Sequence, residues 1–191
     1  TGSAEALDLL EQFGGGLPEI AHWIKQRPAA TALSSTFRII ASGPHSLKAA
    51  EVALRARGFD ASITADSQVG LADDNALMLA ELVRRRPAGR PQVWLMGGEV
   101  DVRVSGQGRG GRNVQFAARM AQALDGVPAW QFLAADTDGQ DGNAPNAGAF
   151  CDGTSWARAR ALGLDPDAYL DNNDTHSLFE ALGDAFITGP T

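Results

Sequence analysis

The spacing of hydrophobic and polar positions changes repeatedly along the chain, and short apolar runs alternate with amphipathic stretches. This alternation predicts an α/β protein with a parallel sheet joined by right-handed crossovers. Strands are expected over residues 37–42, 59–65, 92–98, 99–104, 130–135 and 185–188. Helices are expected over residues 3–13, 18–27, 46–58, 71–86, 112–126, 153–163 and 175–184, with a short one after Asp165–Pro166.

The pattern changes character near residue 97. Residues 92–98 form the apolar run of a buried strand, whereas 99–104 alternate polar and apolar residues, which indicates one solvated face and antiparallel pairing. We therefore expect a boundary between residues 1–96 and 97–191. The chain lacks an initial Met and ends as FITGPT, so we expect part of a longer protein to be missing at both ends.

The most informative segment is GGEVDVRVSGQGRGGRN, residues 97–113. Glycine lacks the Cβ that would keep a backbone N–H away from an anion, and a helix start favours negative charge. Arg109 and Arg112 add forked donors that suit phosphate or carboxylate. The segment predicts an anion site at the start of helix 112–126, and a flexible surface loop is the alternative.

Gly106, Gly108 and Gly111 also satisfy the spacing G-x-G-x-x-G of a dinucleotide-binding turn. This spacing makes a nicotinamide-dependent reductase a competing hypothesis. The half-polar strand before the turn and the two arginines within it weigh against that hypothesis.

An acidic loop follows the apolar strand 130–135 and contains Asp136, Asp138 and Asp141. Ligands of open α/β sheets bind at this edge, and carboxylate oxygens suit Mg²⁺. The spacing is not that of an EF-hand. The alternative is a solvated turn in which the Asp side chains bond local backbone N–H groups.

Composition narrows the function classes. The chain has 191 residues, 44% of them hydrophobic, which is enough for a sizeable core, and its formal net charge of -7 argues against nucleic-acid or membrane binding. Neither a transmembrane run, a signal peptide, a Walker loop nor a nucleophile elbow is present in this sequence. The lone Cys151 excludes an internal disulfide, and we expect a buried structural thiol and a cytoplasmic protein.

The second half of the chain resembles the MOFRL family, the C-terminal domain of class II glycerate 2-kinases, which have also been labelled hydroxypyruvate reductases. The resemblance rests on residues 97–113, on DTDGQDG (136–142), on residues 147–174 and on LGDAFITGPT (182–191). It implies the end of a Rossmann-like parallel-sheet domain, followed by a smaller α/β domain with a mixed sheet. It also implies transfer of the ATP γ-phosphate to the 2-hydroxyl of D-glycerate, with Mg²⁺, in a cleft between two domains.

The resemblance also implies roles for individual residues. Arg109 and Arg112 would act in catalysis by binding the glycerate carboxylate or the transferring phosphoryl group, and Asp138 and Asp141 would hold the metal. The remaining expected residues are Gly97, Gly98, Glu99, Gly108, Gly110, Gly111 and Asn113 for the substrate, and Ser42, Gly43, Asp136 and Thr137 for the nucleotide.

This chain departs from the family pattern at several positions. Gln115 and Asn146 stand where the family usually has carboxylates, and Asp136 stands where it usually has Gly. The family's N-terminal domain is absent, so we expect the chain to be inactive alone and to need that domain as a partner; a homodimer is left open. The alternatives are a hydroxypyruvate reductase and a non-catalytic homologue.

Overall fold

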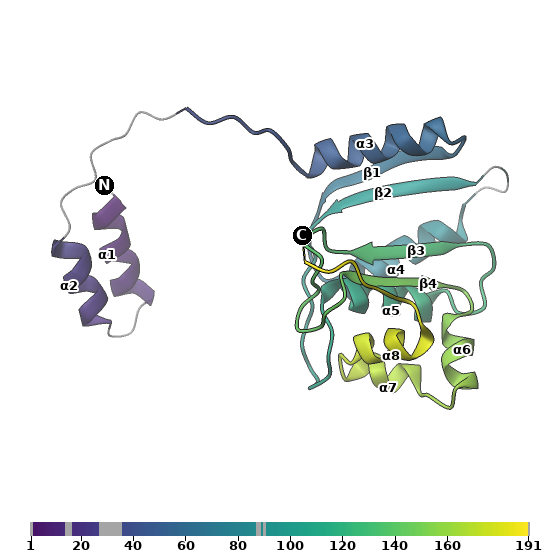
Figure 1. Cartoon of the computed structure of the whole chain (residues 1–191). Helices are drawn as coiled ribbons and strands as arrows, with labels where there is room; N and C mark the ends of the chain where they lie inside the picture. The colour runs from purple at the N-terminus through teal and green to yellow at the C-terminus, as the bar shows by residue number, and fades with distance from the viewer. Residues whose placement is uncertain (1, 14–16, 27–35, 87–88, 90, 191) are drawn as a thin grey trace. The chain divides into compact units, whose positions relative to one another are not determined.

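A computed structural model describes residues 2–13, 17–26, 36–86, 89 and 91–190. The chain divides into two compact units, residues 1–40 and 41–191. In the first unit, helices α1 (Gly2–Phe13) and α2 (Pro18–Gln26) pack on each other (Figure 1). Both helices were expected from the sequence.

Two of the expected strands are wrong. Residues 36–42 have no regular structure, and Phe37 and Ile40 are 89% and 88% exposed, because no described strand pairs with this segment. Residues 99–104 form only an isolated bridge, between Asp101 and Leu71. Gly98 has a φ of 143°, which turns the chain out of the strand before residue 99.

A parallel layer opens the second unit. It contains α3 (Gly43–Ala56), β1 (Asp60–Gln68), α4 (Ala72–Arg84) and β2 (Gln92–Gly98), and β1 pairs with β2 in parallel from Asp60↔Gln92 onward. Helix α3 lies directly on these strands. A Cβ at Gly97 would come within 2.9 Å of the Leu47 side chain, so glycine lets the helix approach the sheet.

The second sheet is antiparallel. It is formed by β3 (Gln131–Ala135), β4 (Gly148–Asp152) and β5 (Ala185–Phe186), with β4 in the middle. Strand β4 is absent from the sequence prediction, because its five residues begin with glycine directly after the acidic loop. The α/β class is confirmed, and the pairing in this sheet is antiparallel throughout the described strands.

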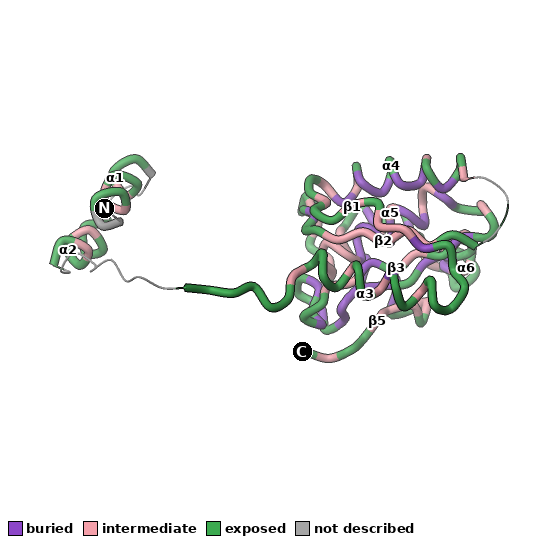
Figure 2. Tube along the Cα trace, turned by 90° about the horizontal axis from the view of Figure 1, so that it is seen from above, coloured by how far each residue is buried: buried purple, intermediate pink, exposed green. Residues whose placement is uncertain are grey.

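Helix α5 (Arg112–Ala123) is the centre of the core. It packs against α4 and against the β3–β4 sheet, and Figure 2 shows the long buried stretches of both helices. Small side chains let the two helices approach closely. The alanines that face this core are Ala72, Ala76 and Ala80 of α4 and Ala117, Ala118 and Ala121 of α5.

Three short helices close the unit. They are α6 (Ser155–Ala161), α7 (Pro166–Asp171) and α8 (Thr175–Leu182), and the Asp165 side chain caps α7 as expected. Arg158 of α6 pairs with Asp184, which lies between α8 and β5. The predicted boundary at residue 97 stays a prediction, since the division at residue 40 does not test it.

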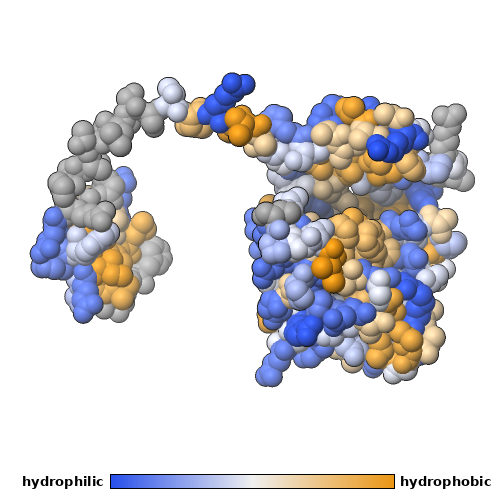
Figure 3. Space-filling view, viewed as in Figure 1, coloured by the Kyte–Doolittle hydropathy of each residue, from blue (hydrophilic) through white to orange (hydrophobic). Residues whose placement is uncertain are grey.

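The face of the β3–β4 sheet away from α5 keeps apolar side chains at the surface. Leu133 and Phe150 are paired across the strands and are 45% and 46% exposed, and Figure 3 shows apolar surface on the side of β3 and β4. Cys151 points to the buried side, where burial raises the pKa of its thiol well above the ordinary value. None of the described helices has the length and apolar character required to cross a bilayer.

Candidate active site

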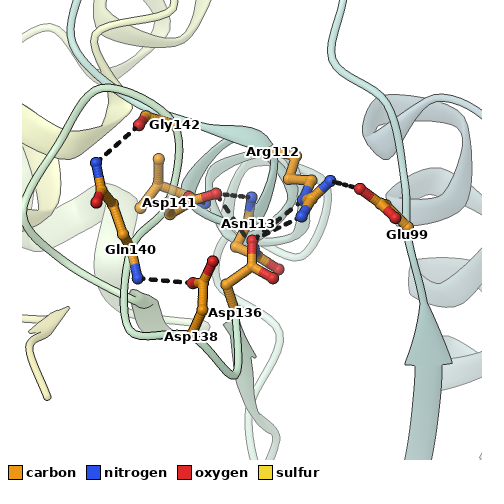
Figure 4. A network of polar contacts seen from close by, with 9 residues as sticks. Glu99, Arg112, Asn113, Asp136, Asp138, Gln140, Asp141 and Gly142 are labelled. Carbon is orange, nitrogen blue, oxygen red and sulfur yellow. Dashed lines mark hydrogen bonds and ion pairs between the residues drawn. The ribbon is translucent and has the colours of Figure 1, made fainter. Parts of the chain in front are cut away.

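Strands β2 and β3 run toward the same side of the molecule (Figure 1). A group of charged side chains gathers where they end (Figure 4). Glu99 follows β2, Asp136 follows β3, and Arg112 begins α5. The arginine network is defined here as Glu99, Arg112, Asn113, Asp136 and Asp141 (Figure 4). The rule that open α/β sheets bind ligands at the carboxyl ends of their parallel strands applies here to β2, whereas β3 belongs to the antiparallel sheet.

Arg112 lies between two carboxylates in this network (Figure 4). Its Nε and Nη2 donate to Asp136 Oδ2 over 3.2 and 2.9 Å, and its Nη1 donates to Glu99. Burial alone would lower the pKa of the Arg112 guanidinium, but the bonds to Glu99 and Asp136 outweigh it and raise that pKa above its usual value. The positive charge of Arg112 is therefore permanent and is locally balanced.

Asp141 is fully buried and supports the first turn of α5. Its carboxylate accepts hydrogen bonds from the backbone N–H of Asn113 at 3.1 Å and of Val114 at 2.8 Å. The Asn113 amide bridges Asp141 and Asp136, at 3.2 Å from each. Burial raises the pKa of the Asp141 carboxyl, although these hydrogen bonds offset part of the increase. Asp141 thus fixes the start of the helix that carries Arg112.

The glycine loop, residues 105–111, is not an open cradle of main-chain amides. The N–H groups of Ser105 and Gly106 donate to the Asn173 side chain, at 2.8 and 2.9 Å. Those of Gln107, Gly108, Arg109 and Gly110 donate to Asn172 Oδ1, Asn172 O, Asp174 Oδ1 and Asn143 Oδ1. These hydrogen bonds would have to break before the amides could hold an anion, and the substrate roles of Gly108 and Gly110 stay predictions.

Close packing explains why the loop is rich in glycine. A Cβ at Gly106 would lie 2.1 Å from the Asn172 carbonyl oxygen, and one at Gly108 would lie 2.4 Å from Asp174 Cα. A Cβ at Gly111 would lie 2.4 Å from Asp141 Oδ1. The absent side chains thus allow the loop to lie against the α7–α8 junction and the acidic loop.

The two arginines that were expected to share an anion have different partners. Arg109 Nη2 lies 3.5 Å from Glu180 Oε2 on α8, and both side chains are more than half exposed. The backbone carbonyl of Arg109 accepts a hydrogen bond from the backbone N–H of His176. Arg112 instead faces the ends of β2 and β3. Within the described contacts the two guanidinium groups therefore do not converge on one partner.

The acidic loop offers carboxylates of two kinds. Asp141 uses its oxygens for α5, whereas Asp138 is exposed and accepts one bond, from the Gln140 N–H at 3.0 Å. Over the part of the chain that the structure describes, no group of three or more His, Cys, Asp or Glu side chains forms a metal site. The metal roles of Asp138 and Asp141 stay predictions.

The remaining predicted residues lie near the same strand ends. Ser42 precedes α3, and its Oγ lies 2.8 Å from His45 Nδ1. Gly97 and Gly98 end β2, and Thr137 is exposed after β3. The nucleotide roles of Ser42, Gly43, Asp136 and Thr137 stay predictions, as do the substrate roles of Gly97 and Gly98.

Sequence reasoning missed the residues that hold the glycine loop. They are Asn143, Asn172, Asn173 and Asp174, and Asp174 directly precedes α8. The Asp174 side chain accepts bonds from the Arg109 N–H and from the Ser177 hydroxyl. The run Asn-Asn-Asp was the available signal, because such side chains bond neighbouring backbone and tolerate positive φ. Asn173 indeed has a φ of 53°.

The chain is therefore an α/β protein with a network of charged side chains at the ends of strands β2 and β3. The model of the MOFRL family matches residues 92–191, and the chain belongs to that family.

Individual relatives match nearly the whole chain. A D-glycerate 2-kinase of Thermotoga maritima is 32% identical over 99% of this chain and 47% of its own length. An Agrobacterium vitis protein, whose name provisionally assigns it as a hydroxypyruvate reductase, is 34% identical over 98% of this chain and 45% of its own. The crystal structure of a Thermotoga maritima glycerate kinase matches with a TM-score of 0.85 and 31% identity, over 98% of this chain and 47% of that one. This chain thus spans about half the length of these relatives.

Proposed function

We propose that this chain is part of a glycerate 2-kinase, which transfers the γ-phosphate of ATP to the 2-hydroxyl of D-glycerate. Membership in the MOFRL family and the kinase names of several relatives support the kinase class. The single observation that carries the proposal is the position of Arg112. Its guanidinium lies where two strands end and where α5 begins, which is a place for an anionic ligand.

Arg112 is the central group of the proposed chemistry. Phosphoryl transfer needs mainly positioning and stabilisation of developing negative charge, without a covalent nucleophile. A guanidinium matches the oxygens of a phosphoryl group or a carboxylate in a bidentate way. In this proposal Arg112 binds the reacting anion and Asn113 orients it, while Glu99 borders the site. The bond from Arg109 to α8 favours a peripheral role for Arg109.

The acidic loop partly fits the Mg²⁺ that the family implies. Mg²⁺ commonly takes one or two protein carboxylates and completes its shell with water and substrate phosphates. Asp138 is exposed and fits that role, whereas the oxygens of Asp141 already accept hydrogen bonds from α5. When bound, the metal would neutralise charge on the phosphates. Asp141 would then act through α5, by holding Arg112 and Asn113 at the site.

The reductase hypothesis has support from the name of the Agrobacterium vitis relative. A dinucleotide turn, however, offers free backbone N–H groups to a pyrophosphate. Here those of Gly106 and Gly108 donate to Asn173 and Asn172. This arrangement favours the kinase.

The hypothesis of a non-catalytic homologue rested on Gln115 and Asn146. Both side chains are buried and hydrogen-bonded, Gln115 with Asp73 and Asn173, and Asn146 with the Gly148 carbonyl. Each amide therefore has a structural role that does not depend on catalysis. Only an activity assay can distinguish an enzyme from a non-catalytic homologue.

Because the chain spans about half the length of its relatives, we propose that activity requires the rest of the full-length protein, as partner domain. The full-length protein is mixed with D-glycerate, ATP and Mg²⁺, and in a second assay with hydroxypyruvate and NAD(P)H. Glycerate-dependent ADP release is expected, and the 191-residue chain alone is expected to give none. Oxidation of NAD(P)H without ATP would instead identify a reductase, and inactivity of the full-length protein in both assays would favour the non-catalytic homologue.

A further inference from the structure

In this structure, protein carboxylates already surround the guanidinium that the proposed function assigns to an anion. A guanidinium has five N–H donors. Nε and Nη2 of Arg112 both donate to the same oxygen of Asp136, and Nη1 donates to Glu99. An incoming oxyanion that uses the Nε–Nη2 edge must therefore displace Asp136.

The two carboxylates hold Arg112 to different extents. The side chain of Glu99 is 73% exposed, and that of Asp136 is 23% exposed. Asp136 also accepts a bond from the Asn113 amide, which Asp141 holds in place. Exposed ion pairs contribute little because water screens them, whereas partly buried pairs are screened less. Asp136 is thus the stronger competitor of the two.

We propose that Asp136 is a built-in competitor for the anion site of Arg112, so that an oxyanion occupies this site only if it binds the guanidinium more strongly than a protein carboxylate does, as a phosphate dianion can. A carboxylate ligand carries one negative charge and gains little by replacing the carboxylate of Asp136. A phosphate dianion carries more charge and three acceptor oxygens, so it displaces Asp136 more readily. This inference rests on the proposed function and deepens it, because it assigns Arg112 to the phosphoryl group rather than to the carboxylate of glycerate.

The test measures binding of inorganic phosphate and of D-glycerate to the full chain at fixed ionic strength, by calorimetry or NMR titration. The wild type is expected to bind phosphate more tightly than D-glycerate. Asp136→Asn keeps the size and one acceptor oxygen but removes the charge. Because breaking the Asp136–Arg112 pair costs the same free energy whichever anion replaces it, both anions should bind about tenfold more tightly, and phosphate should gain at least as much as D-glycerate. The preference for phosphate should therefore persist.

A matched control removes the same charge elsewhere. Asp125 pairs with Arg160 at 2.8 Å and its side chain is 30% exposed, which is close to the pair of Asp136 with Arg112. Asp125→Asn should leave both affinities unchanged. If both Asn variants gained the same anion affinity, the change in net charge alone would explain the effect, and the inference would be overturned.

Arg112→Gln separates this inference from the proposed function. If Arg112→Gln abolishes phosphate binding while Asp136→Asn changes no affinity, Asp136 is not a competitor, although the site itself stands. If Arg112→Gln leaves phosphate binding unchanged, the role of Arg112 in the proposed function fails as well. If Asp136→Asn binds both anions more weakly, Asp136 supports Arg112 instead of competing with its ligand, and the inference alone is overturned.

A second measurement needs no variant. On titration of the wild type with phosphate, the NMR signal of the Arg112 Nε–H should shift together with the side-chain carboxyl signal of Asp136. A shift at Arg112 with Asp136 unmoved would contradict displacement.

Discussion

The glycine loop and the arginine network lie next to each other at the start of α5, and they use their polar groups in opposite ways. The backbone N–H groups of residues 105–110 in the loop donate to side chains of residues 172–174, to the Asn172 carbonyl and to the Asn143 side chain. The network keeps a charged guanidinium that is 31% exposed, between two carboxylates. The difference shows that a glycine-rich segment before a helix can be a packing element; in our proposal the anion binds instead to the side chain of Arg112, which follows the segment.

Asp141→Ala should have the largest effect, because it removes the buried support of α5. The backbone N–H groups of Asn113 and Val114 would lose their acceptor, and loss of a cap together with buried unsatisfied donors costs about 2–4 kcal/mol. Urea denaturation measures the loss. Asp141→Asn retains one acceptor oxygen and should lose less. Equal stability of the wild type and Asp141→Ala would refute this structural role.

Arg112→Ala compared with Arg109→Ala tests which arginine acts in catalysis. In the full-length protein, removing a contact made in the transition state should lower kcat about 100-fold, or about 2.7 kcal/mol. The Arg109 side chain pairs with the exposed Glu180 on α8, away from the ends of β2 and β3, so Arg109→Ala should lower kcat less than tenfold. Steady-state kinetics give both values, with circular dichroism as the control for folding. The reverse order would move the site to the glycine loop.

Gly108→Ala tests the loop as a packing element. The new Cβ would lie 2.3–2.4 Å from Asp174 atoms, and such overpacking costs about 1–3 kcal/mol. Gly43→Ala is the matched control, because a Cβ there meets nothing within 4 Å and should change the unfolding free energy by less than about 0.5 kcal/mol. If both variants unfold at the wild-type urea concentration, the loop is not tightly packed.

The smallest effect concerns His176, which lies beside the glycine loop on α8. Its ring is 1% exposed, and neither ring nitrogen has a hydrogen-bond partner among the described residues. Burial, and then the charge of Arg109, lower the pKa of His176 below its ordinary value of 6.5, against the opposing charges of Glu180, Asp174 and Asp141.

Below pH 6.5 the unfolded chain therefore binds a proton at His176 that the folded chain does not. The free energy of unfolding should decrease as the pH is lowered below 6.5. The full contribution is present above pH 6.5. Urea midpoints between pH 7.5 and 5.5 measure this slope, and His176→Phe, which has no titrating group, should flatten it. An unchanged slope in His176→Phe would assign the pH dependence to other groups.

Hydrophobic periodicity in the sequence was enough to predict most elements of the fold. Helices α3, α4 and α5 and strands β1, β2 and β3 lie close to their expected positions, because a buried face imposes its spacing on the local sequence. The strand predicted over residues 37–42 is wrong, because a strand forms only where a neighbouring strand pairs with its backbone N–H and C=O groups. Strand β4 was missed because it is short and begins with glycine directly after the acidic loop, so its pairing with β3 and β5 leaves no clear local pattern.

The candidate site, like the fold, could be predicted from the sequence only in part. The sequence alone determined that Arg112, Asp136 and Asp141 flank one helix start and one strand end, because these positions are local to single elements. Only the tertiary structure decided which carboxylate faces Arg112, which one caps α5, and that residues 172–174 occupy the amides of the glycine loop. Those pairings join residues 24 to 68 positions apart, and chain connectivity does not fix such contacts until the core has packed.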